Sequence, residues 1–169
     1  GSIEYFRGNG DAAADALLEA MALLEHSDPH GSVAAAADAV LALVRARKPE
    51  QAVETARAAR SLAPTDGGES DFEATATLGY ALCFAGRYTE AEPHLQRAVE
   101  LLAGRTAIPS LLQAVRLSAA LAWLGRYEHA RAYMTSLVER ARRAGAVGSL
   151  PNLLAGSAWQ SLHSGHWNE

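Results

Sequence analysis

The residues with the greatest capacity for chemistry are six histidines and one cysteine, and the spacing of the histidines does not predict a metal site. His163 and His166 are three residues apart, but His166 falls in an expected turn between helices and no third ligand is adjacent. His26 and His30 flank Pro29, so they do not share a helical face. We therefore expect solvent-exposed or turn histidines, which do not bind a metal ion.

The thiol and carboxylate groups do not form a catalytic pattern either. Cys83 lies within an apolar run, and a reactive thiol needs a basic neighbour, so we expect a small core or groove residue. Glu90 and Glu92 fall early in an expected helix, where acidic groups complement the positive helix terminus. The sequence contains no Gly-rich phosphate loop ending in Lys-Ser or Lys-Thr, no Gly-x-Ser-x-Gly and no His-Glu-x-x-His. It therefore predicts a protein that is not an enzyme and has no catalytic residue, cofactor or metal ion.

The composition favours packed helices over sheets. The 169 residues include 37 alanines, and alanine combines the highest helix propensity with a small side chain. The net charge of −4 argues against direct contact with nucleic acid, which requires an excess of basic groups. A single cysteine and the absence of a long apolar run predict a reducing, cytoplasmic location without a membrane contact.

The chain repeats with a period of 39–40 residues. Gly86-Arg87-Tyr88 recurs after 39 residues as Gly125-Arg126-Tyr127, and Gly165-His166-Trp167 follows after 40 more. In each copy a helix should end at the glycine, which permits a left-handed turn, and a second helix should begin at the aromatic residue. An alanine three positions after the tyrosine lets the two helices approach closely, and the same register continues backward through Ala52 and Ala13.

This pattern resembles the tetratricopeptide repeat. The matching residues are Leu78, Gly79, Leu82, Gly86, Tyr88, Ala91, Leu95 and Ala98. The resemblance implies an all-α, tetratricopeptide-like solenoid, in which antiparallel helix pairs form a right-handed superhelix of about eight helices. We expect helices at approximately 11–26, 32–46, 49–63, 70–85, 88–103, 109–124, 127–144 and 150–164.

The repeats predict a single helical-repeat domain over residues 1–169. Complete repeats are expected at 33–71, 72–110 and 111–150, with partial repeats at 1–32 and 151–169. Because both ends cut through a repeat, we expect a fragment of a larger protein. Exposed solenoid ends would also favour a homodimer.

The candidate binding residues follow from the same resemblance. In tetratricopeptide repeats the ninth and thirteenth positions of the first helix face a concave groove. Among these positions the binding candidates are Arg45, Tyr80, Phe84, Trp123, Trp159 and His163. A row of aromatic rings suits a peptide, a helix or an apolar small molecule. The alternative is that these rings fill gaps in the core between helices, and both interpretations stay open.

The segment from Glu139 to Trp167 is similar to the repeat region of large ATP-dependent transcription regulators of the LuxR type, the maltose-regulator-like class of actinobacteria. In that class a nucleotide-binding module precedes the repeats and a helix-turn-helix domain follows them. The resemblance implies a sensor and coupling segment of a bacterial transcriptional regulator, which binds a small-molecule inducer or a regulatory protein on its concave face. The alternative is a general protein–protein adaptor that binds an extended peptide or a helix.

Overall fold

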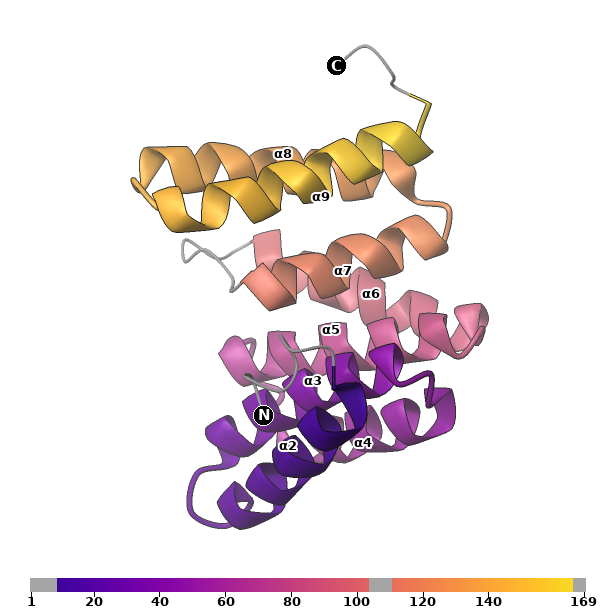
Figure 1. Cartoon of the computed structure of the whole chain (residues 1–169), viewed down its shortest axis with the longest axis vertical. Coiled ribbons are helices and arrows are strands. Elements are labelled where there is room, and N and C mark those ends of the chain that lie inside the picture. The colour runs from indigo at the N-terminus through magenta and orange to yellow at the C-terminus, as the bar shows by residue number, and fades with distance from the viewer. Residues whose placement is uncertain (1–8, 104–110, 166–169) are drawn as a thin grey trace. The chain divides into compact units, whose positions relative to one another are not determined.

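The computed structural model describes residues 9–103 and 111–165, and this part of the chain is all-α, with no strand (Figure 1). Its helices are α2 (Gly10–Leu24), α3 (Pro29–Arg45), α4 (Pro49–Leu62), α5 (Glu69–Phe84), α6 (Tyr88–Ala103), α7 (Leu111–Trp123), α8 (Tyr127–Arg143), the short 3-10 helix η1 (Val147–Ser149) and α9 (Leu150–His163). The eight helices expected from the sequence are confirmed, and no boundary differs by more than three residues. No helix in these two ranges is long and apolar enough to cross a membrane.

The chain forms two compact units, which we call unit 1 (residues 1–102) and unit 2 (residues 103–169). In unit 1, α3 contacts α2, α4 and α5, and α4 also contacts α5. In unit 2, α8 lies beside both α7 and α9, and α7 also contacts α9 (Figure 1). The single repeat domain that the periodicity predicts remains a prediction.

Small side chains fill the contacts of α3 in unit 1. Ala36, Ala37 and Ala39 have no exposed surface, and neither have Val40 and Leu43. Alanine adds little bulk between helices, so neighbouring backbones can approach closely while the larger aliphatic residues supply buried apolar area. The alanine-rich composition therefore contributes to packing as well as to helix formation.

The start of α3 is set by its cap. The Asp28 side chain accepts a hydrogen bond of 3.0 Å from the Gly31 amide, and Pro29 occupies the first turn, where its missing N–H is not needed. For this reason the helix begins at Pro29, three residues earlier than expected.

A buried ion pair joins the end of α4 to the start of α5. Arg60 Nη1 lies 2.8 Å from Asp71 Oδ1, and the Asp71 side chain is only 5% exposed. The same guanidinium donates to the carbonyls of Ala63 and Pro64, beyond the end of α4. Gly67 N donates to the other Asp71 oxygen, so one carboxylate orders the whole α4–α5 connection.

Helix α5 is buried on every side from Ser70 to Cys83. At Gly79 an added Cβ would lie 2.5 Å from Leu95 Cδ2 of α6, closer than any side chain tolerates. Glycine is therefore required for this approach of α5 and α6, at the position where the repeat pattern predicts a small residue.

The turns between paired helices share one backbone conformation. Gly86, Gly125 and Gly165 have φ angles of 74°, 72° and 80°, the left-handed region that the sequence predicted. Arg47 stands 39 residues before Gly86 and also has a positive φ, 58°. The turn of the earlier repeat thus has the same geometry without a glycine, at the expense of backbone strain.

This difference predicts opposite effects of two substitutions. Arg47→Gly should raise the free energy of unfolding by up to about 1 kcal/mol, because it relieves a left-handed non-glycine residue. Gly86→Ala should lower it by about 1 kcal/mol or more for the converse reason. Urea unfolding followed by circular dichroism measures both. Equal effects of the same sign would contradict the shared turn geometry.

Candidate functional site

The structure places the predicted groove residues in different environments. In unit 1, Arg45 is exposed at the end of α3, Tyr80 is buried within α5, and Phe84 is half-buried at the end of α5. In unit 2, Trp123 at the end of α7 is 38% exposed and Trp159 in α9 is 40% exposed. His163 is the last residue of α9, and its side chain lies outside the described part of the chain.

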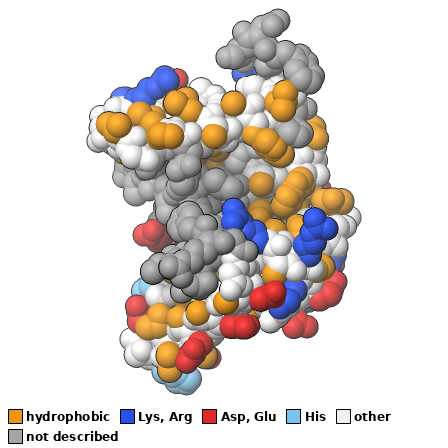
Figure 2. Space-filling view, in the orientation of Figure 1, with side chains coloured by type: hydrophobic (Ala, Val, Ile, Leu, Met, Phe, Trp, Pro, Cys, Tyr) orange, Lys and Arg blue, Asp and Glu red, His pale blue; other side chains and the backbone are white. Residues whose placement is uncertain are grey.

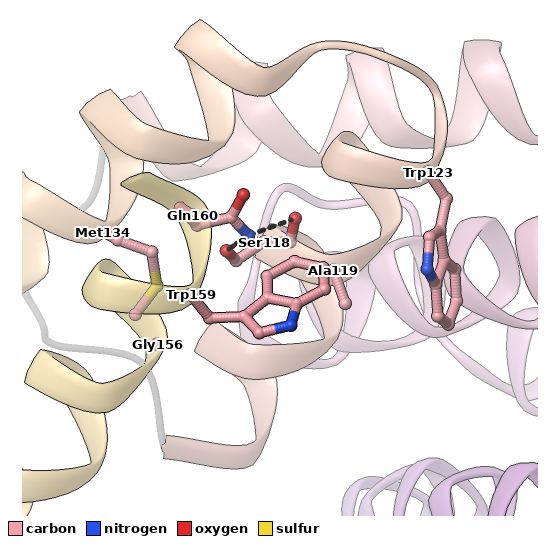
Figure 3. Close-up of a pocket in the computed structure, with 7 residues that line it drawn as sticks. All are labelled: Ser118, Ala119, Trp123, Met134, Gly156, Trp159 and Gln160. Atoms are coloured by element: carbon pink, nitrogen blue, oxygen red, sulfur yellow. Dashed lines mark hydrogen bonds between the residues drawn. The ribbon is translucent and has the colours of Figure 1, made fainter. Parts of the chain in front are cut away.

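Trp123 and Trp159 line a single cavity of about 240 Å³ within unit 2 (Figure 3). Its seven described lining residues come from α7, α8 and α9: Ser118, Ala119, Trp123, Met134, Gly156, Trp159 and Gln160. In Figure 3 the two indoles lie on either side of Ala119. The structure therefore brings together two of the six residues predicted from the repeat register.

A pair of hydrogen bonds fixes the spacing of α7 and α9 beside the cavity. Gln160 Nε2 donates to Ser118 Oγ at 2.7 Å and to the Ser118 carbonyl at 3.2 Å. Both residues are buried, and both amide hydrogens of the glutamine are used. Because Gln160 follows Trp159 and Ser118 precedes Ala119, these bonds fix the spacing of the α9 and α7 backbones next to Trp159 and Ala119.

Gly156 makes room for the remaining apolar wall. A Cβ at residue 156 would lie 2.6 Å from Met134 Cε, so any side chain there would displace the methionine methyl group. Methionine is flexible and polarisable, and it adapts to irregular apolar surfaces. The α8 wall of the cavity can therefore adjust to the shape of a bound molecule.

The cavity presents almost no polar chemistry. None of its seven described lining residues is charged. Gln160 Oε1 is enclosed and has no hydrogen-bond partner in the described structure, so a molecule in the cavity does not reach it. Among the described residues no group of three His, Cys, Asp or Glu side chains is arranged to hold a metal ion. The arrangement is therefore suited to binding apolar surface.

Five of the cavity residues were not predicted as binding residues: Ser118, Ala119, Met134, Gly156 and Gln160. Gln160 and Ser118 are 42 residues apart, and neither residue type predicts its partner from sequence. The only local signal is the run Gly156-Ser157-Ala158, whose small side chains indicate a close contact on α9.

The single cysteine is a separate candidate for reactivity, and its surroundings suppress that reactivity. Cys83 is 2% exposed within α5, and burial raises the pKa of its thiol from 9.0 to about 12. The reactive thiolate is therefore scarce in the folded chain near neutral pH.

Alkylation of Cys83 by iodoacetamide at pH 8 should be at least about a hundredfold slower in the folded chain than in urea. Because folding raises this pKa, the contribution of the thiol to stability is fully present below pH 9.0 and is lost as the pH rises toward 12. Mass spectrometry of timed samples measures the labelling. Equal rates with and without urea would show that the thiol is accessible.

No protein-family model matches this chain, and no similar protein was found among curated proteins or solved structures.

Proposed function

We propose that this chain is a non-catalytic sensor and coupling segment that binds a small apolar molecule in the cavity between α7, α8 and α9. The observation that carries the proposal is the joint lining of one cavity by Trp123 and Trp159. Both indoles keep about two-fifths of their surface exposed, which a ring that only fills the core does not do. A concave, mostly apolar site of this kind is the usual setting for small-molecule binding.

The wider architecture that we propose is a tetratricopeptide-like solenoid of antiparallel helix pairs in a right-handed superhelix. Three observations support it. The left-handed turns recur every 39–40 residues. Gly79 packs closely against Leu95 of the next helix. In each unit a helix also contacts the second helix after it, α3 with α5 and α7 with α9. In such arrays each repeat contacts only its neighbours, so a small rotation at one ligand site can accumulate along the array.

The regulator in which this segment would act is a LuxR-type, maltose-regulator-like transcription factor in the bacterial cytoplasm. The resemblance carried by the segment from Glu139 to Trp167, which covers most of residues 72–169, supports this assignment. Its test is the coding sequence on either side of the segment. A nucleotide-binding loop upstream and a helix-turn-helix pattern downstream are expected, and an unrelated enzyme domain on either side would overturn the assignment.

Filling the cavity should abolish ligand binding without unfolding the chain. Ala119→Leu adds apolar volume between the two indoles, and leucine is a good helix former. Small apolar compounds that raise the melting temperature of the original chain should therefore not raise that of Ala119→Leu. Ala132→Leu is the matched control, because Ala132 is exposed on α8 and does not line the cavity. Equal shifts in both variants would place binding elsewhere.

A second candidate function is a protein–protein adaptor, and one surface of α9 favours it. Among the side chains of α9 that the structure describes, the exposed ones are all apolar: Pro151, Leu154, Ala155, Ala158, Trp159 and Leu162. Leu154 is 43% exposed and Leu162 is 50% exposed. In Figure 2 hydrophobic side chains are spread over the surface where α9 lies in Figure 1. A continuous apolar face of this width suits an amphipathic helix of a partner protein.

The adaptor and the sensor are distinguished by Leu162→Glu. A charge on the apolar face, at its C-terminal end, should weaken binding of a partner helix in a pull-down experiment, because the carboxylate would be desolvated on docking. Leu162 does not line the cavity, so the affinity for apolar compounds should be unchanged. Loss of compound binding with partner binding intact would contradict this division of roles.

A further inference from the structure

We propose that the unit 2 cavity is an aromatic clamp, which binds an uncharged planar molecule of two fused rings between the indoles of Trp123 and Trp159. This inference rests on the proposed function and names the class of ligand that the same cavity accepts. It follows from the shape of the walls, the absence of charge and the volume.

The walls suit a flat ring. The two indoles lie on either side of Ala119 (Figure 3), and all three residues line the same cavity. Aromatic rings attract one another in offset-stacked or edge-to-face arrangements, and each such pair contributes about 0.5–1.5 kcal/mol beyond the area it buries. Two indoles on one ligand therefore favour a planar aromatic molecule over a saturated one of equal volume.

The spacing of the clamp is fixed before a ligand arrives. The Gln160–Ser118 hydrogen bonds tie α9 to α7 at the residues next to Trp159 and Ala119. A preformed site avoids the entropic penalty of ordering its walls on binding. Met134 on the third wall is the adaptable element, since the space beside its methyl group depends on Gly156.

The ligand should be uncharged. None of the seven described residues that line the cavity carries a charge, and an ionised group would lose its hydration there without gaining a partner. This holds although residues 103–169 contain seven arginines and only three glutamates, an excess that attracts anions to the surface of unit 2. For an anionic ligand, loss of hydration in the cavity thus opposes binding, whereas the long-range attraction favours it.

The volume of the cavity limits the size of the ligand. A buried apolar cavity of about 150 Å³ accommodates benzene. A cavity of about 240 Å³ has room for a second fused ring.

Calorimetric titration of the whole chain with three compounds, each built on two fused six-membered carbon rings, tests the clamp. We expect 2-naphthol to bind at least about tenfold more tightly than decahydro-2-naphthol, which has the same skeleton and hydroxyl group but is saturated and not planar. We expect 2-naphthoate, the anionic analogue, to bind at least about tenfold more weakly than 2-naphthol. Equal affinity for the planar and saturated compounds would overturn the clamp and leave the apolar cavity of the proposed function intact. Stronger binding of 2-naphthoate would overturn the requirement for an uncharged ligand.

Variants show whether the two indoles carry the preference. Trp123→Leu and Trp159→Leu keep an apolar side chain and remove the ring. Each should therefore lower the affinity for 2-naphthol at least about fivefold and change the affinity for the saturated compound little. The matched control is Tyr127→Leu, since Tyr127 is as exposed as Trp123, at 38%, but does not line the cavity. Circular dichroism confirms that each variant is folded. Unchanged binding in both tryptophan variants would overturn the clamp.

Failure of the clamp and failure of the proposed function have different signatures. If none of the three compounds binds but other small apolar compounds stabilise the chain and not Ala119→Leu, only the clamp is wrong. If no apolar compound of any shape stabilises the chain, the proposed function is wrong as well.

Discussion

Close approach between helices, permitted by residues with small side chains, is the constraint on which the rest of the structure depends. Gly79 allows Leu95 to pack directly on the backbone of α5, and four alanines of α3 have no exposed surface: Ala36, Ala37, Ala39 and Ala42. The same principle shapes the cavity of unit 2, where Gly156 makes room for Met134 and the small Ala119 lines the cavity together with two indoles. A substitution that adds bulk at Gly79 therefore alters helix spacing as well as local contacts, whereas the cavity has room for added volume at Ala119.

The positions of the helices could be predicted because their signals are local. Glycine two residues before an aromatic residue marks the turns at Gly86, Gly125 and Gly165, and the apolar spacing that follows predicts the next helix. The N-terminus of α3 was placed three residues late because the cap formed by Asp28 and Pro29 was not recognised. The sequence signal for the turn at Arg47 is also weak, because its left-handed backbone occurs without the usual glycine.

The candidate site could be predicted only in part. Trp123 and Trp159 were identified because the repeat register assigns them to the same surface. The hydrogen bonds between Ser118 and Gln160 join residues that are 42 positions apart, and both residue types are common on solvent-exposed helix faces. Such a pairing depends on how α9 packs on α7, which periodicity does not specify. Tyr80 follows the same register as Trp159 but is buried, so equivalent repeat positions do not have equivalent exposure.

The single thiol lies in unit 1, whereas all three tryptophans, at positions 123, 159 and 167, lie in unit 2. The chain thus contains one intrinsic reporter for each unit. The rate at which Cys83 is labelled reports transient opening of α5. The fluorescence emission of the tryptophans reports changes in their surroundings in unit 2. Local opening events in a protein span a wide range of free energies, and segments that open separately behave as independent cooperative units. A comparison of the two signals in one denaturation series would thus reveal whether the chain unfolds in one cooperative transition or in separate steps.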